Sequence, residues 1–461
     1  MDKILRTTKV WCCGCEDEHE AAVYEECNAV LCKTSCPLGD KTVTLSDDAA
    51  LWKAICEKSC FDPGLKTGLP KGSFVPGLSP MLPEPDGGNR CSNKGVRLYR
   101  LDITSACNFR CPICYADAGG KAEEFFIGLE TVEEIAGFLQ MEGAKGVSLS
   151  GGEPTLHPEL EKIIAIFKKA GIKSTILTNG IRIAQEEGYA QRLKKSGLRR
   201  AYVQFDTLDP AVHEKMRGND FVDEKKKALE NCVKAKIKTS VISVIIKDNL
   251  DETGALLSYM KNLVPWFGEI IFVTAIRETG RFDLPLDSFV YKEGIIKSLV
   301  KTSSVSGINE GVFYPLPVYK PFGLNVSPES NVVLPVVFID DKIELLEKYV
   351  DMGKFVRLLN EEAGMRDTRA SRLKMLGFFL VSLKLKRVAA LFRILFGYLT
   401  KMGRTYINYV LIENFLSKDY QDLACLDNCN AYYVGPGGKL SSACVYNQGF
   451  KSGHPWTRRD E

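Results

Sequence analysis

The chain has 461 residues, of which 45% are hydrophobic and 26% charged, and its formal net charge is +3. Such values are normal for a folded protein of about two or three domains, so they exclude disorder over most of the chain. The near balance of charge argues against nucleic acid as a partner. The 4 histidines are scattered, which argues against hydrolysis built on several histidines.

The 16 cysteines are grouped along the chain. The first residues, MDKILRTTKV, contain no apolar run typical of a signal peptide, so we expect a cytoplasmic protein with reduced thiols. Clustered thiols in that compartment more often bind metal than form disulfides. Composition predicts three zones: a Cys-rich metal-binding region at 1–95, an α/β core at 96–280, and a mixed C-terminal domain at 281–461.

The N-terminal zone contains two cysteine pairs. Cys12 and Cys15 form a CxxC, and Cys32 and Cys36 form a CxxxC about 20 residues later. Two such pairs are typical of a zinc ribbon or a rubredoxin-like knuckle, and the spacing does not distinguish zinc from iron. A set of reduced thiols is the alternative. Cys56, Cys60 and Cys91 follow in the same zone.

Strand-like and helix-like segments alternate in the middle zone. The pattern predicts parallel βαβ units, as a partial barrel or a doubly wound sheet, with ligands at the carboxyl ends of the strands. We expect the lone Cys232, in a helical segment, to be a small buried hydrophobe. The expected strands are 96–104, 145–150, 172–178, 199–206, 238–247 and 269–276, and the expected helices are 131–143, 159–171, 184–197, 225–236 and 251–263.

Three cysteines follow the first of these strands directly. Cys107, Cys111 and Cys114 have the spacing C-x3-C-x2-C. Thiolates are the usual ligands of a [4Fe–4S] cluster, and three of them leave one iron open to a small molecule. A structural zinc ion is the alternative, but it prefers four ligands.

Polar residues and glycines stand at the ends of the next strands. The second strand ends in Gly151-Gly152-Glu153-Pro154, the third in Thr178-Asn179, and the fourth in Gln204-Phe205-Asp206. The cysteine loop followed by GGEP on consecutive βα units resembles the radical S-adenosylmethionine (SAM) superfamily. The resemblance covers roughly residues 96–280 and implies a partial (β/α)6 barrel.

The resemblance also implies roles for these residues. The cluster on Cys107, Cys111 and Cys114 would offer its open iron to the amino and carboxylate groups of SAM, and Gly151, Gly152, Glu153 and Pro154 would hold the amino group. Thr178, Asn179, Gln204 and Asp206 would contact the ribose or carboxylate, and a strand near Val244 or Val273 would pack the adenine. Reductive cleavage of SAM would give a 5′-deoxyadenosyl radical that removes hydrogen from a substrate. His157 is expected to be a loop residue without a catalytic role.

The last cysteines are Cys425, Cys429 and Cys444. The turn GPGG between Tyr433 and Leu440 predicts a hairpin. With Cys56, Cys60 and Cys91, these cysteines are candidates for one or two auxiliary [4Fe–4S] clusters. Free thiols around a structural hairpin are the alternative.

A basic, apolar stretch runs from Arg369 to Arg404. It contains nine Lys or Arg and no Asp or Glu, and its longest uncharged run, Met375 to Leu383, is too short for a membrane span. The composition suits a helix lying on an anionic membrane surface, which would place the protein on the inner face of the membrane. A core helix with snorkelling cations and a groove for nucleic acid are the alternatives.

Taken together, the chain is similar to the tetraether lipid synthase subgroup of radical SAM enzymes. The shared features are K-x-x-C-P at Lys33–Pro37, the loop ACNFRCPICYADAG, and the segment Tyr432–Asn447. The resemblance implies coupling of two phospholipid or ether-lipid chains by a C–C bond, with a low-potential ferredoxin or flavodoxin as electron donor. A radical SAM C-methyltransferase or peptide-modifying enzyme is the alternative function. A metal-binding regulatory protein without catalysis is a third.

Overall fold

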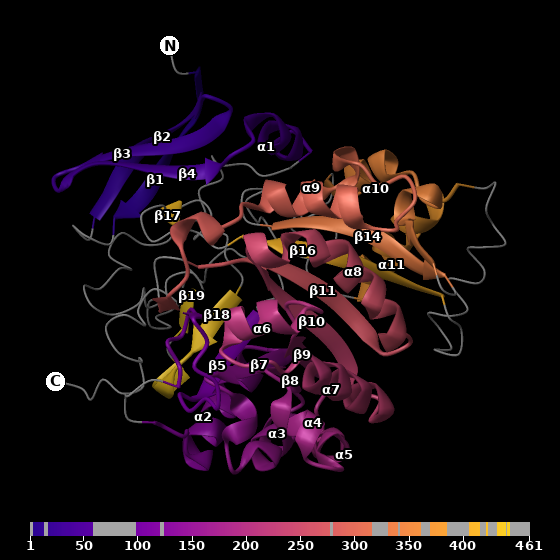
Figure 1. The fold of residues 1–461 in the computed structure, drawn as a ribbon. Helices are drawn as coiled ribbons and strands as arrows, with labels where there is room; N and C mark the ends of the chain where they lie inside the picture. Colours follow the sequence, from indigo (N-terminus) through magenta and orange to yellow (C-terminus); the bar gives the residue numbers. More distant parts are fainter. Residues whose placement is uncertain are drawn as a thin grey trace.

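The computed structural model describes residues 3–12, 17–58, 98–119, 124–276, 280–315, 331–339, 342–360, 369–384, 405–414, 421–422, 431–438 and 440–442. A small N-terminal sheet packs beside a large α/β unit (Figure 1). Among the described residues, none of the helices has the length and apolar character needed to cross a membrane.

Six parallel strands form the centre of the large sheet. Their order in space equals their order in the chain, with each strand hydrogen-bonded to the next. This arrangement confirms the predicted partial barrel. The strands are β5 (Leu98–Thr104), β7 (Gly146–Gly151), β8 (Lys173–Thr178), β9 (Arg200–Gln204), β10 (Lys238–Ile245) and β11 (Phe267–Thr274).

Helices between the strands cover the outer face of the sheet (Figure 1). The single helix predicted over 184–197 is wrong, because Gly188, with φ of 71°, separates two shorter helices. Helix α6 was not predicted; Pro210 stands at its start, and the Asp209 side chain accepts the Ala211 N–H at 2.8 Å. The helices are α2 (Leu129–Met141), α3 (Leu160–Lys169), α4 (Ile181–Gln185), α5 (Tyr189–Ser196), α6 (Pro210–Arg217), α7 (Val222–Lys234) and α8 (Thr253–Tyr259).

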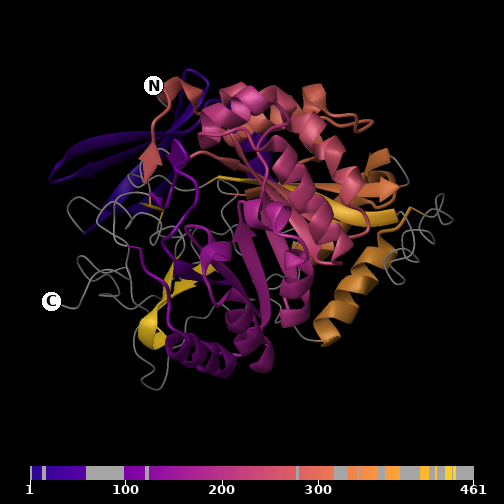
Figure 2. The same cartoon turned by 60° about the horizontal axis from the view of Figure 1, so that its bottom comes forward.

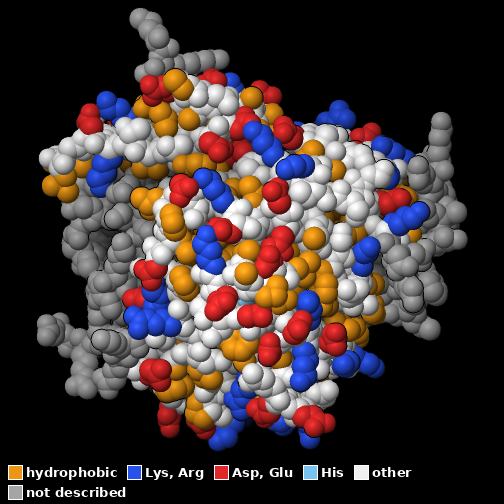
Figure 3. Space-filling model, in the orientation of Figure 1, with side chains coloured by type: hydrophobic (Ala, Val, Ile, Leu, Met, Phe, Trp, Pro, Cys, Tyr) orange, Lys and Arg blue, Asp and Glu red, His pale blue; other side chains and the backbone are white. Residues whose placement is uncertain are grey.

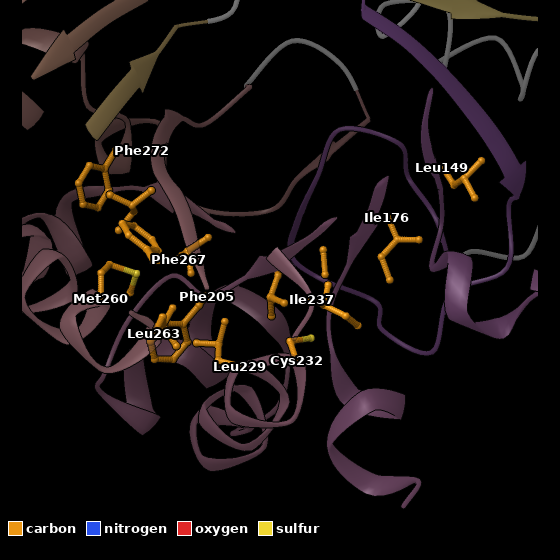
Figure 4. Close-up of a cluster of buried hydrophobic side chains, with 14 of the residues drawn as sticks. Leu149, Ile176, Phe205, Leu229, Cys232, Ile237, Met260, Leu263, Phe267 and Phe272 are labelled. Carbon is orange, nitrogen blue, oxygen red and sulfur yellow. The ribbon is translucent and has the colours of Figure 1, made fainter. Parts of the chain in front are cut away.

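The main hydrophobic core fills the space between the sheet and these helices. Phe205, Leu229 and Met260 are fully buried there, and their side chains lie together in Figure 4. Cys232 belongs to the same cluster with an exposed fraction of 0%, and burial raises its thiol pKa to about 12. The prediction that Cys232 is a packing residue is confirmed.

Strands from the C-terminal zone extend the barrel sheet on both edges. Strand β16 (Thr405–Glu413) pairs in parallel with β11, and β18 (Ala431–Val434) pairs in parallel with β5. The predicted hairpin is confirmed, because β19 (Leu440–Ser442) returns antiparallel to β18. Figure 2 shows β18 and β19 beside α2, and Gly438 lies against the Phe138 ring of that helix.

The sheet continues beyond β16 with further strands, and helices pack beside it. Strand β14 (Asn331–Ile339) is antiparallel to β16 and carries β13 (Tyr314–Pro315) and β15 (Lys342–Leu345). Helix α9 (Lys292–Thr302) packs on α8, and α10 (Met352–Asn360) packs on α11 (Arg369–Val381). Helix α11 is the first part of the basic, apolar stretch that runs from Arg369 to Arg404.

The N-terminal sheet is antiparallel and small. Its order is β17-β1-β2-β3-β4, so a two-residue strand from the C-terminal zone completes it. Helix α1 (Ala49–Cys56) follows β4 along the chain. The strands of this sheet are β1 (Lys3–Cys12), β2 (Asp17–Glu26), β3 (Ala29–Cys36), β4 (Gly39–Ser46) and β17 (Gln421–Asp422). On the face drawn in Figure 3, acidic and basic side chains are interspersed over the described surface.

Candidate functional site

The cysteine loop lies at the carboxyl end of β5. Cys107, Cys111 and Cys114 are partly exposed, and the Phe109 N–H donates to Sγ of Cys107 at 3.4 Å. Cys114 lies in a two-residue strand, β6 (Ile113–Cys114), that pairs with β12 (Arg281–Phe282). The predicted cluster ligands therefore share one loop at the predicted end of the barrel.

The chemistry of these thiols fits an iron–sulfur cluster. Burial raises the pKa of Cys107 to about 12 and also raises the pKa of Cys114. Thiols with raised pKa values stay protonated near neutral pH unless a metal displaces the proton. Among the residues that the structure describes, no three His, Cys, Asp or Glu side chains converge on a single metal ion. A cluster has a different requirement, since each thiolate binds a separate iron.

The GGEP segment packs against the start of this loop. The Gly152 N–H donates to the Thr104 carbonyl at 2.8 Å, and the Glu153 N–H donates to the Ala106 carbonyl at 2.7 Å. A Cβ on Gly151 would lie 2.0 Å from the Thr104 oxygen, and one on Gly152 would lie 2.2 Å from the Ala106 oxygen. Glycine is required here because the two backbones are in direct contact.

Glu153 connects the ends of two strands. Its carboxylate is 1% exposed and accepts from the Thr155 N–H, the Thr178 hydroxyl at 2.7 Å and the Asn179 N–H at 2.6 Å. Asn179 reaches the cysteine loop, since its side-chain N–H donates to Oδ1 of Asn108 at 2.7 Å. The predicted residues of the second and third strand ends are thus brought together with the loop.

Gln204 and Asp206, at the end of β9, belong to a buried polar group. The Gln204 amide donates to the Asp206 carboxylate. Asp206 is fully buried and also accepts from Arg217, at 2.7 Å from Nε, and from the Val244 N–H at 2.8 Å. The structure therefore gives Asp206 partners within the chain, and its contact with SAM stays a prediction.

Lys225 of α7 is a site residue that the sequence did not reveal. Its side chain is fully buried, and Nζ donates to Oε1 of Gln204 at 2.7 Å and to the Asn179 carbonyl at 2.5 Å. Nζ also lies 5.0 Å from the ring centroid of Phe109, in the cysteine loop. Burial is the main reason why the pKa of Lys225 is lowered to about 8. The site therefore holds a cation facing the loop and two strand ends.

Arg281, in β12, forms hydrogen bonds with the cysteine loop. Arg281 donates to the Cys111 carbonyl at 2.6 Å, to the Ala118 carbonyl at 3.0 Å and to Oδ1 of Asp117 at 2.5 Å. Gly280, just before it, approaches the backbone of Cys114 and Tyr115 so closely that a Cβ would collide. The GGEP segment thus holds the start of the loop, and Gly280 and Arg281 hold the part of it around Cys111 and Cys114.

His157 lies in a loop, as predicted. It is 2% exposed, its Nε2 lies 3.0 Å from the Ile127 carbonyl, and its Nδ1 accepts the Glu159 N–H at 3.1 Å. Burial lowers its pKa. Nδ1 therefore supports the turn before α3, and Nε2 joins this turn to the segment before α2.

The predicted knuckle and auxiliary ligands are only partly described. Cys32 is buried in the core of the N-terminal sheet, and Cys36 ends β3. Cys12 ends β1, which runs parallel to β3 in the order β1-β2-β3, so Cys12 and Cys36 stand at the same end of that sheet. Cys56 ends α1. Cys15, Cys60, Cys91, Cys425, Cys429 and Cys444 lie outside the described residues.

Comparisons with known proteins agree with this geometry. A family model described as the Radical SAM superfamily matches residues 101–260. The 7,8-dihydro-6-hydroxymethylpterin dimethyltransferase of Methanocaldococcus jannaschii is 24% identical over 482 residues, which cover 95% of this chain and 92% of that protein. A probable GTP 3′,8-cyclase of Methanococcus aeolicus is 32% identical over 161 residues, and the match spans 34% of this chain and 52% of the cyclase.

Among solved structures, SuiB of Streptococcus suis bound to S-adenosylmethionine is similar at 18% identity and a TM-score of 0.39. The match covers 44% of this chain and 46% of SuiB. The motif order, the strand topology and the family match agree on residues 101–260. The chain therefore contains a radical SAM superfamily domain.

Proposed function

We propose that this protein is a radical SAM enzyme that methylates carbon in a small heteroaromatic substrate of the pterin type. The observation that carries the proposal is the similarity to the pterin dimethyltransferase, which extends over 95% of this chain and so includes both zones outside the barrel. The cyclase, in contrast, matches only 34% of the chain. When bound on Cys107, Cys111 and Cys114, a [4Fe–4S] cluster supplies the electron for cleavage of SAM.

The residues around the loop have separate tasks in this proposal. Glu153 fixes the ends of β7 and β8, so that backbone groups of the GGEP turn are available to the amino group of SAM. Lys225 provides the positive charge for the SAM carboxylate, next to Gln204. Asn179 joins this part of the site to the cysteine loop through Asn108. These side chains bind and orient SAM, and the barrel sheet keeps them in place.

The proposal is tested with the full-length protein, loaded with iron and sulfide without oxygen. We expect 5′-deoxyadenosine and a methylated product when reductant, SAM with a deuterated methyl group and 7,8-dihydro-6-hydroxymethylpterin are present, as measured by mass spectrometry. Deuterium in the product shows whether SAM also donates the methyl group. Formation of deoxyadenosine without any methylated pterin, but with altered phospholipid, would contradict the proposal.

Lipid-chain coupling is the second candidate, and one specific observation favours it. Leu373, Leu376, Leu380 and Val381 of α11 are 68%, 45%, 49% and 57% exposed, while Phe378 and Phe379 pack inward on a hydrophobic cluster. An exposed apolar face on a helix without acidic residues suits an anionic membrane surface. Sedimentation with anionic vesicles, in the full-length protein and a Leu373→Ser/Leu376→Ser/Leu380→Ser variant, distinguishes this candidate. A lipid enzyme should lose vesicle binding in the variant, whereas a pterin enzyme should show none in either protein.

Replacement of Lys225 by methionine is expected to weaken SAM binding by about 10- to 100-fold at pH 7, because a hydrogen bond to a charged group contributes about 1.5–3 kcal/mol. The advantage of the wild type should shrink as the pH rises through about 8, since the wild-type lysine then loses its proton. Equilibrium dialysis of SAM between pH 7 and pH 9.5 measures both effects. The ratio between the two proteins cancels the titration of SAM itself.

Lys226→Met is the matched control. Lys226 is the next residue of α7, but its side chain is 35% exposed and pairs with Asp223. We expect wild-type affinity at every pH. An equal loss in the two variants would show that net charge, and not the buried position, is responsible.

A further inference from the structure

We propose that Arg217 raises the reduction potential of the cluster by holding a fixed positive charge and an N–H donor against the loop segment between Cys111 and Cys114. Arg217 would be a positioning residue, acting on the cluster through its ligands. The inference rests on the cluster of the proposed function and is independent of the substrate.

The first observation is how firmly Arg217 is held. It is the last residue of α6, and Gly218 ends the helix with φ of 82°. Its Nε and Nη2 donate to the two oxygens of Asp206 at 2.7 and 3.0 Å. The exposed fractions of the two side chains are 8% and 0%. A forked ion pair of this kind fixes the plane of the guanidinium group.

The second observation is where the remaining donors point. Nη1 donates to the Ile113 carbonyl at 3.1 Å, and Ile113 lies between Cys111 and Cys114 in the loop. The Asp206 carboxylate outweighs the effect of burial and raises the pKa of Arg217 above its ordinary value, so the guanidinium group keeps its positive charge. The guanidinium group thus lies between Asp206 on one side and the cysteine loop on the other.

Physical chemistry gives the direction of the effect. Reduction adds a negative charge to the cluster, and donors or positive charge near its sulfur ligands stabilise the reduced form. Asp206 opposes part of this effect, but it lies on the far side of the guanidinium group from the loop. Burying an ion pair costs desolvation energy and often adds little to stability, so the pair calls for an explanation other than stability alone.

The test is a redox titration of the loaded full-length protein without SAM, followed by electron paramagnetic resonance of the reduced cluster. At the wild-type midpoint, Arg217→Gln is expected to lower the ratio of reduced to oxidised cluster about tenfold, which is 59 mV for one electron. Arg217→Lys, which keeps the charge but loses the fork, should shift the midpoint less. Arg200→Gln is the control, because Arg200 forms a partly buried ion pair with Glu269 at the start of β9, and no shift is expected.

Asp206→Asn gives a test of sign that does not depend on the arginine variants. It removes the negative charge and leaves the guanidinium group, so the midpoint should rise. An unchanged or lowered midpoint in Asp206→Asn, or a wild-type midpoint in Arg217→Gln with normal iron content, would overturn the inference. Iron quantitation separates this result from failure of the proposed function: a wild type without a cluster contradicts the function, whereas a cluster with an unshifted potential contradicts only the role of Arg217.

Discussion

Replacement of Cys107, Cys111 and Cys114 together by alanine is expected to reduce formation of 5′-deoxyadenosine to background. The three thiols share one loop beside Glu153 and Lys225, and no cluster can be anchored there without them. Iron and sulfide content, with Mössbauer spectra of wild type and variant, measures the loss. Iron that remains in the variant reports the predicted auxiliary clusters and the knuckle at Cys12, Cys15, Cys32 and Cys36.

Cys232→Ala serves as the control for the loss of a buried thiol. Cys232 is fully buried in the main core, between α7 and the sheet. We expect a modest cost in stability, about 1 kcal/mol, with full iron content and full deoxyadenosine formation. Deoxyadenosine at the wild-type rate from the triple variant would refute the assignment of the cluster loop.

Gly151→Ala is expected to destabilise the protein by about 2–5 kcal/mol and to prevent loading of the cluster. Gly151 has φ of 126°, and a Cβ there would lie 2.0 Å from the Thr104 carbonyl oxygen. That carbonyl already accepts the Gly152 N–H, so the segment leading into the cysteine loop would have to move. The melting temperature without oxygen, together with iron content, measures the effect.

Gly171→Ala separates the backbone conformation from the collision. Gly171 follows α3 with φ of 77°, and a Cβ there would meet nothing within 4 Å. Its substitution should cost only about 1–2 kcal/mol and leave the iron content unchanged. If the two substitutions cost the same, the close approach of the GGEP turn to Thr104 would have no energetic importance.

The order of the barrel and the location of its site were predictable because both are local in sequence. From β5 onward helices alternate with the barrel strands, the cysteine loop follows the first strand, and the polar residues of GGEP and Thr178-Asn179 stand at strand ends. The parallel topology then brings these ends together, as the bonds from Glu153 to Thr178 and Asn179 show.

Lys225 and Arg217 were missed because their environment is set by tertiary packing. Lys225 begins a run of three lysines, a pattern typical of a solvated helix face, yet it is the one whose side chain reaches Gln204 and the Asn179 carbonyl. Arg217 ends a short helix that the sequence pattern did not predict. The helical period did contain a signal for Lys225, because it places this lysine on the same buried face as Leu229 and Cys232.

The pairing of β18 with β5 and of β16 with β11 has a consequence for synthesis of the chain on the ribosome. All motifs of the radical SAM domain have emerged once residue 276 has left the exit tunnel. The strand partners of Leu98 and Ile270, which are Ala431 and Val410, have not yet been synthesised at that point. Until they are, both outer strands of a nascent sheet have unpaired N–H and carbonyl groups, which invite pairing with other chains. A chain that stops near residue 400 would therefore contain every motif of the radical SAM domain and still be prone to aggregate.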